Sequence, residues 1–229
     1  DATADGYICG DGCASVLLAP LADFPGDATW NRTGPPEPLG IVAAARTMQS
    51  ASMAAPAGPG NRELVVDSAR AAGIDPLDVD AVECHGEAGV VSDAAEAVAL
   101  ARALRGGRAA PPLLLSCAKP CLANLRTCAG IAGLVRVLLS QARGVPTPLV
   151  HMRQVNPHLG AELLKHVSFC VESVALRGAS SYCGVASHGF GGTAAHVLTW
   201  NVVDQGVQPP EARRTTAGLE HRPPFWPAP

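Results

Sequence analysis

Apolar and polar residues follow two alternating patterns along this chain. Short apolar runs bounded by turn residues predict strands at residues 12–22, 39–46, 79–84, 111–117, 167–174, 181–187 and 193–200. Apolar residues at helical spacing predict helices at residues 61–72, 94–105 and 125–142, each closed by a nearby glycine. Strands that alternate with helices predict an α/β fold built from layers of sheet and helix.

Turn and cap residues mark the ends of these elements. Asp93 and Glu96 have the spacing of a capping box, which predicts the start of the helix at residues 94–105. Residues 189–192, Gly-Phe-Gly-Gly, predict a tight turn between the last two strands. We expect loops at residues 23–37 and 51–60 and a Pro- and Arg-rich tail at residues 204–229, either docked along a surface or disordered.

The helix predicted at residues 125–142 is apolar around most of its circumference, whereas a surface helix carries one apolar stripe. One side has small residues, namely Ala129, Gly130, Ala132 and Gly133. Another element can therefore approach that side closely. We expect the helix to be sandwiched between two layers, and the alternative is an ordinary amphipathic helix over a sheet.

Composition limits the classes of protein to which the chain can belong. Of its 229 residues, 48% are hydrophobic and 16% are charged, which suits one domain or two small ones and excludes disorder throughout. The net charge is −3 and there is no long basic block, so a nucleic-acid surface is not indicated. No apolar run approaches the ~20 residues that span a bilayer, and the first residues lack the pattern of a signal peptide.

The eight cysteines have spacings that fit neither a zinc site nor a disulfide framework. Cys9 and Cys13 are four positions apart, as are Cys117 and Cys121, and no Cys-x-x-Cys occurs. We expect small buried thiols in a reducing compartment, such as the cytoplasm or the interior of a plastid, and a structural metal is the alternative.

Several short motifs follow one another along residues 1–200. They are Asp5-Gly6-Tyr7 with Gly10-Asp11-Gly12-Cys13, Val82-Glu83-Cys84-His85-Gly86, Asp93 with Glu96, Ser116-Cys117-Ala118-Lys119, Ala129-Gly130-Ile131-Ala132-Gly133-Leu134, Gly144-Val145-Pro146 with Asn156-Pro157-His158, and Gly189-Phe190-Gly191-Gly192-Thr193-Ala194-Ala195-His196. In order and spacing they resemble landmarks of the β-ketoacyl synthases of polyketide and fatty acid synthesis, in particular the ketosynthase domains of modular polyketide synthases.

The resemblance implies a thiolase-like fold, in which two similar halves stack as five layers of helix and sheet. The chain resembles the C-terminal half, with residues 1–203 as the ketosynthase-like domain and residues 204–229 as the tail. The helix at residues 125–142 would be a buried central helix whose neighbour lies in the other half. We therefore expect a protein partner over that helix: the missing N-terminal half, a second copy or a larger complex.

A ketosynthase needs a thiolate that carries the acyl group, two polar side chains that hold a thioester carbonyl, and an oxyanion hole. The resemblance places His85 and Asn124 at the two polar positions, where the family usually has histidines. It places Lys119 beside them to tune the local field, and Phe190 in the turn that supplies an oxyanion amide and gates the acyl pocket. Without the resemblance, His85 is a core histidine, Lys119 a surface lysine and Phe190 part of a hairpin.

Several positions depart from the family pattern. Glu87 and Gly89 stand where threonines contact the phosphopantetheine arm of an acyl carrier protein. His188 stands where phenylalanine is usual, and Ala194 where asparagine is usual. The nucleophile motif Asp-Thr-Ala-Cys-Ser does not occur in the sequence.

Two hypotheses follow from these similarities and departures. The first is a degenerate ketosynthase-like chain that is catalytically silent alone and acts as a partner or structural subunit of a larger assembly. The second is the C-terminal half of a split ketosynthase, which condenses acyl and malonyl thioesters with a Cys supplied by another chain. No permanently bound cofactor is expected, only the phosphopantetheine of a carrier protein if the site is active.

Overall fold

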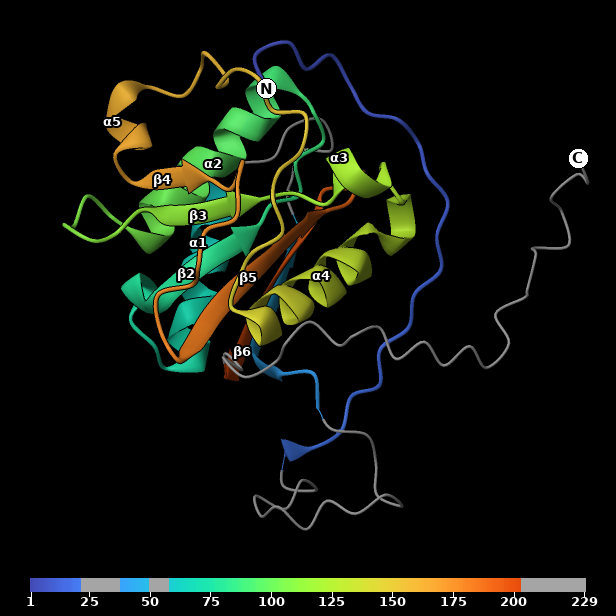
Figure 1. Ribbon diagram of the computed structural model, residues 1–229, viewed down its shortest axis with the longest axis vertical. Helices are drawn as coiled ribbons and strands as arrows, with labels where there is room; N and C mark the ends of the chain where they lie inside the picture. The colour runs from blue at the N-terminus through green and yellow to red at the C-terminus, as the bar shows by residue number, and fades with distance from the viewer. Residues whose placement is uncertain (22–37, 50–57, 203–229) are drawn as a thin grey trace, which may run out of the picture.

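The computed structural model describes residues 1–21, 38–49 and 58–202. Its core is one six-stranded sheet with the strand order β1-β6-β5-β2-β3-β4 (Figure 1). The strands are β1 Ile41–Gln49, β2 Val79–Glu83, β3 Leu113–Ser116, β4 Val167–Phe169, β5 Ser180–His188 and β6 Thr193–Val202. β2 pairs in parallel with β3 and β5, β3 pairs in parallel with β4, and β6 pairs antiparallel with β1 and β5. All the strands predicted after residue 38 are therefore confirmed, although their ends shift.

Helices cover both faces of this sheet. α1 (Gly58–Ala72) and α2 (Val90–Leu104) pack together on one face, and α4 (Ala129–Arg143) lies over β5, β6 and β2 on the other (Figure 1). Because side chains alternate along a strand, Leu113 and Leu115 pack with α1 and α2 while Leu114 packs on the α4 side. The predicted α/β layers are thus confirmed. Within the described residues, no helix is both long and apolar enough to cross a membrane.

The start of α2 differs from the prediction. Its N-cap is Gly89, so Asp93 lies in the first turn and Glu96 lies inside the helix. The capping box predicted from Asp93 and Glu96 is therefore wrong. The carboxylate of Glu96 is instead bound by the loop after β2, where it accepts hydrogen bonds from the N–H groups of His85 and Gly86.

The buried strand predicted at residues 12–22 is also wrong. Residues 12–20 form no strand, and Leu17 is 86% exposed. A strand needs a neighbour for its backbone hydrogen bonds, and within the described residues none runs beside this segment. The predicted loop at residues 23–37, most of the one at 51–60 and the tail at 204–229 lie outside the described residues, and residues 58–60 begin α1.

The helix predicted at residues 125–142 begins as a 3₁₀ turn, Arg126–Cys128, and continues as α4. Gly144, at φ +67°, ends it as expected. Its small residues lie against its own sheet: a Cβ added at Gly130 would come within 3.1 Å of Ser187, and one at Gly133 within 3.2 Å of Glu83. The close approach predicted from the small residues is therefore made by β5 and β2.

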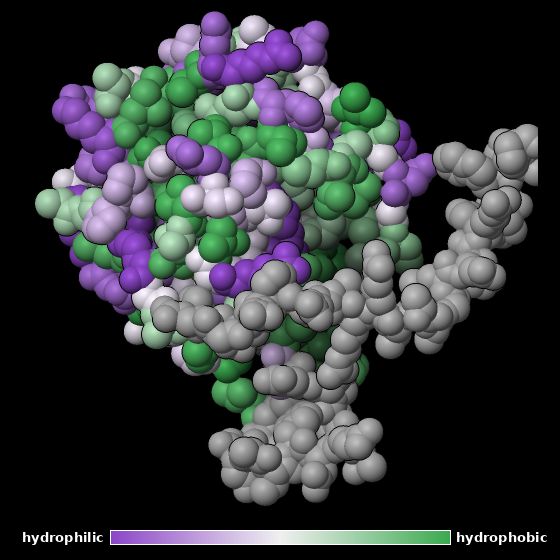
Figure 2. Space-filling model, in the orientation of Figure 1, coloured by the Kyte–Doolittle hydropathy of each residue, from purple (hydrophilic) through white to green (hydrophobic). Residues whose placement is uncertain are grey.

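The opposite side of α4 is apolar as well. Ile131, Val135, Leu138 and Leu139, which we call the outer face of α4, are partly exposed, and Leu139 is 43% exposed. In the space-filling view, hydrophobic side chains gather where α3 and the start of α4 lie (Figure 2). The sheet therefore covers only one of the two apolar sides of this helix.

Candidate functional site

The sheet brings two of the predicted site residues together. β2 and β3 are parallel neighbours, with Glu83 of β2 opposite Ser116 of β3. His85 follows β2, and Lys119 follows β3 as the first residue of the short helix α3 (Lys119–Leu122). Carboxyl ends of parallel strands meet at one edge of the sheet, so the two side chains converge there.

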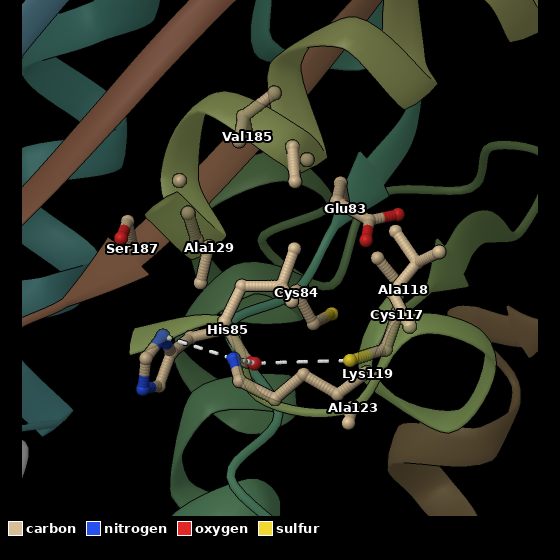
Figure 3. A pocket seen from close by; sticks show the side chains of 16 residues that line it. Glu83, Cys84, His85, Cys117, Ala118, Lys119, Ala123, Ala129, Val185 and Ser187 are labelled. Atoms are coloured by element: carbon tan, nitrogen blue, oxygen red, sulfur yellow. Dashed lines mark hydrogen bonds between the residues drawn. The ribbon is translucent and has the colours of Figure 1, made fainter. Parts of the chain in front are cut away.

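His85 is fixed by contacts from three other elements. Glu96 of α2 accepts its backbone N–H at 2.6 Å, and the ammonium of Lys119 is bonded to its carbonyl oxygen and lies 3.4 Å from Nδ1 (Figure 3). The backbone N–H of His188, at the end of β5, donates to Nδ1 at 3.2 Å. Because Nδ1 accepts this bond, the proton of the neutral ring is assigned to Nε2.

The surroundings of His85 keep its ring neutral. Burial, together with the nearby Lys119 and His188, lowers the pKa of His85 to about 3. A neutral imidazole that carries its proton on Nε2 can donate one hydrogen bond to a carbonyl oxygen. Together with the Lys119 ammonium, it forms a polar end to a small cavity of about 20 Å3 under α4.

Two departures from the family pattern meet at the same ring. The carboxylate oxygen Oε2 of Glu87 lies 3.9 Å from Nε2 of His85. The ring of His188 lies on another side, with its centroid 5.0 Å from that of His85 and a tilt of 45°. Both residues are thus neighbours of the group that would hold a carbonyl.

Two thiols also line the cavity. Cys117 Sγ lies 3.7 Å from the carbonyl oxygens of His85 and Gly86, and Cys84 lies between Glu83 and His85 in sequence (Figure 3). Burial raises the pKa of Cys117 to about 12 and raises that of Cys84 well above the ordinary range, and nearby carboxylates act in the same sense. Both thiols are therefore protonated at neutral pH.

Asn124 lies beside this cavity rather than in it. It is buried, and its Oδ1 accepts the N–H of Arg126 at 3.0 Å, while its backbone pairs with Ile8 and Gly10. It lines a neighbouring groove of about 880 Å3, which shares several lining residues with the small cavity, namely Cys84, Cys117, Lys119, Leu122 and Ala123. His85 and Asn124 therefore line two different hollows that meet along a shared wall, which includes Lys119 and Cys117.

The remaining predicted site residues, Phe190, Gly89 and Glu87, lie outside the lining of the small cavity. Phe190 is 75% exposed at the tip of the β5–β6 hairpin and lines neither cavity. Gly89 is the N-cap of α2. Glu87 is therefore the one of the two predicted phosphopantetheine positions that directly faces His85.

A buried ion pair below the site was missed by the sequence analysis. Arg136 of α4 is bonded to the carboxylate of Glu83, which also accepts from Ser116 Oγ at 2.8 Å. Arg136 donates in addition to the carbonyl oxygen of Thr147 at 2.7 Å. The sequence does show that Arg136 interrupts the apolar run at residues 131–139, but its partner Glu83 is distant in sequence, so the pair could not be predicted.

The cysteines agree with the sequence analysis in part. Four of the eight are buried as expected, whereas Cys9, Cys13 and Cys121 are exposed.

Comparisons with known proteins agree with the motifs. The family model described as "Beta-ketoacyl synthase, C-terminal domain" matches residues 39–153. One of the proteins of the phenolphthiocerol/phthiocerol polyketide synthase of Mycobacterium tuberculosis is 34% identical over 214 residues, 91% of this chain and 11% of that protein. The 5-methyl-1-naphthoate synthase of Streptomyces sahachiroi is 33% identical over 233 residues, 99% of this chain and 12% of that protein. The chain thus spans about a tenth of the length of these curated relatives.

Solved structures give the same picture for the fold. A ketosynthase domain of the oxazolomycin system, OzmH KS7 from a Streptomyces albus strain, has a TM-score of 0.67 at 23% identity, over 73% of this chain and 30% of that one. The ketosynthase from module 6 of the bacillaene synthase of Bacillus subtilis 168 has a TM-score of 0.66 at 22% identity, over 73% of this chain and 31% of that one. At these identities the likeness shows the fold.

Proposed function

This chain belongs to the β-ketoacyl synthase family, as a C-terminal domain of the polyketide synthase type with a thiolase-like fold, and we propose that it is catalytically silent alone and acts as part of a larger assembly. In that role it keeps the end of the site that can hold a thioester carbonyl, and another polypeptide segment packs against it without bringing a reactive Cys. The family match and the small share of each relative that it covers support a role inside a larger protein or complex.

The state of the thiols is the observation that carries this proposal. Condensation needs a thiolate, because the thiolate and not the thiol attacks an acyl group. Cys84 and Cys117, which line the cavity with His85, both have raised pKa values. The 229 residues also contain no Asp-Thr-Ala-Cys-Ser motif. An acyl group therefore has no attachment point at this cavity.

The polar end of the cavity suits a carbonyl group. The Nε2 proton of His85 is a donor that needs no protonation step, so it can bind the oxygen of an acyl thioester, and the Lys119 ammonium at the Nδ1 edge adds positive charge to the site. The phosphopantetheine arm of a carrier protein would have to pass Glu87 and Gly89, neither of which has a hydroxyl to donate. A carboxylate at Glu87 also repels a phosphate. These residues fit the acyl end of the arm better than its phosphate.

The outer face of α4 indicates where the other segment lies. It carries no charge, and residues 16–18, Val-Leu-Leu, are exposed apolar residues as well. Burying apolar area contributes about 25 cal/mol per Å2, so covering this face stabilises an assembly. We propose that the occupant is the N-terminal half of a ketosynthase, in the same protein or in a partner.

A second candidate is the split ketosynthase, in which that other segment brings the reactive Cys and condensation takes place. The fixed geometry of His85, with Lys119 and Glu96 on its backbone, favours this candidate. A site that had only a structural role would not need its histidine held by three elements.

Transfer of radiolabel from malonyl-carrier protein separates the two candidates. The full-length protein is compared with its His85→Ala variant and with His158→Ala, an exposed control. The first proposal predicts no condensation product and no labelled CO2 above background in any of the three. Condensation that disappears only in His85→Ala contradicts silence and supports the split enzyme.

A further inference from the structure

Negative charge predominates around His85. Three carboxylates, of Glu87, Asp93 and Glu96, lie on the first turns of α2 and the loop before it, against the ammonium of Lys119 and, beside Asp93, that of the N-terminal residue. Their mutual influence is visible at Asp93, whose pKa is raised to about 6 by burial and then by Glu96. Glu83 does not add to this excess because Arg136 neutralises it.

The carboxylate and the ammonium lie at different edges of the His85 ring. Lys119 is at the Nδ1 edge, 3.4 Å away, where it also binds the backbone carbonyl. Glu87 is at the Nε2 edge, 3.9 Å away, and its side chain is 37% exposed. A carbonyl that binds the Nε2 proton is therefore closer to the negative group than to the positive one.

The carboxylate of Glu87 differs from that of Glu96 in what it contacts. Both oxygens of Glu96 are occupied by backbone N–H groups, of His85 and Gly86. Glu87 has no such donors among its contacts in the described residues, apart from the His85 ring at ion-pair distance. The charge of Glu87 therefore acts on any ligand group that binds Nε2 of His85.

We propose that Glu87 determines specificity: through its charge, this site selects uncharged acyl thioesters over thioesters that carry a free carboxylate. This inference rests on the proposed function. A malonyl-type group bound at Nε2 would place its carboxylate within a few Å of Glu87. Like charges at that separation in a partly exposed site weaken binding by about tenfold. Salt reduces the effect because Glu87 is partly exposed.

Binding of acetyl-pantetheine and malonyl-pantetheine to the full-length protein tests this inference. Both probes lack phosphate, so the comparison isolates the acyl group. Dissociation constants are measured by ligand-observed NMR at low and high salt for the parent protein, Glu87→Gln and Glu87→Asp. Glu162→Gln serves as the control, because Glu162 on the short helix α5 (Ala161–Leu164) is an exposed carboxylate away from the site.

The expected result is an acetyl preference of about tenfold that shrinks at high salt, disappears in Glu87→Gln and persists in Glu87→Asp and Glu162→Gln. Equal affinities for the two probes in the parent protein overturn the inference and leave the proposed function standing. A preference that Glu87→Gln does not change also overturns it. Binding of neither probe contradicts the proposed function itself, because the cavity then holds no thioester.

Discussion

At the scale of single residues, His196 on β6 is held neutral by the fold. It is fully buried, and neither ring nitrogen has a hydrogen-bond partner within the described part of the chain. Burial lowers the pKa of His196 to about 4. Gly184 on β5 allows this close packing, because a Cβ there would come within 2.6 Å of Nε2. Protonation of the His196 ring therefore destabilises the folded state.

We predict that His196 makes the protein less stable as the pH falls from about 6.5 to about 4. In that window the unfolded chain binds a proton that the folded chain does not, so the free energy of unfolding decreases with falling pH. The difference in pKa corresponds to a loss on the order of 3 kcal/mol. Urea unfolding of the parent protein and of His196→Leu at pH 7 and pH 4.5 measures it.

The comparison with His196→Leu is needed because other groups titrate in the same window. The carboxyls of Glu83, Asp93 and Glu96 have raised pKa values and oppose the effect. They are present in both proteins and cancel in the difference. The same loss of stability in both proteins would show that His196 has no part in it.

Sequence patterns locate some of these residues but not their contacts. The order of the motifs predicts His85 and Lys119, and the parallel pairing of β2 with β3 brings them together. The bonds from Glu96 to the His85 loop were not predicted, because its spacing from Asp93 is also that of a helix cap. Glu87 and His188 both contact His85, from the loop after β2 and from the end of β5, and these segments are about a hundred residues apart, so no local pattern predicts the contact.

At the scale of elements, the ion pair between Glu83 and Arg136 joins β2 to α4. Both side chains are almost fully buried. Burial raises the pKa of Glu83, while Arg136 and Ser116 act against that rise. A buried pair of this kind contributes little net stability, but removing one partner leaves an uncompensated charge in the interior.

We therefore predict that Arg136→Met lowers the free energy of unfolding by about 3–5 kcal/mol. The double variant Glu83→Gln/Arg136→Met should recover most of this loss, because Gln is neutral and still accepts from Ser116. Chemical denaturation measures both. As a control, Lys165→Met breaks an exposed pair with Glu162 and should cost less than about 1 kcal/mol. A double variant no more stable than Arg136→Met would refute the charge argument.

The end of α3 stores backbone strain. Ala123, its C-cap, has φ 60° and ψ 179°, a region that essentially only glycine occupies. It directly precedes Asn124, whose backbone is fixed by Ile8 and Gly10. The surrounding contacts therefore hold an alanine in a conformation that costs about 1–3 kcal/mol.

Replacing Ala123 by Gly should relieve this strain and stabilise the protein by about 1 kcal/mol, after the greater flexibility of glycine in the unfolded chain is offset. Thermal unfolding should show a higher Tm. Ala72→Gly, at the end of α1, is the matched control and should lower Tm. A lower Tm for Ala123→Gly would mean that the Ala123 methyl group contributes more by packing than its backbone costs.

The elements were predicted well where their partners lie within the described chain. Six strands and the helices on both faces follow from local apolar patterns, since each finds its neighbour in the sheet. Residues 12–22 failed because an apolar run is a strand only when another strand runs beside it. The extent of α4 was predicted, but not that Arg136 points inward, because only the fold supplies Glu83 as its partner.

At the scale of the whole molecule, two incomplete features coincide. The cavity around His85 has donors for a carbonyl and no thiolate. α4, which closes that cavity on one side, keeps a second apolar side partly exposed. Both are explained if this chain is one part of a larger assembly, in which a further polypeptide segment packs on the outer face of α4. The chain spans about a tenth of the length of the curated relatives, which therefore contain sequence beyond the part that it matches.

Photo-crosslinking from the outer face of α4 tests this central claim most directly. Benzoylphenylalanine is placed at Leu139 of the full-length protein, and in a second protein at Glu63, an exposed position on α1. Mass spectrometry of the products should identify a crosslink from position 139 to a peptide outside these 229 residues, with none from position 63. Crosslinks from position 139 only to these 229 residues, or no crosslink at all, would contradict the account.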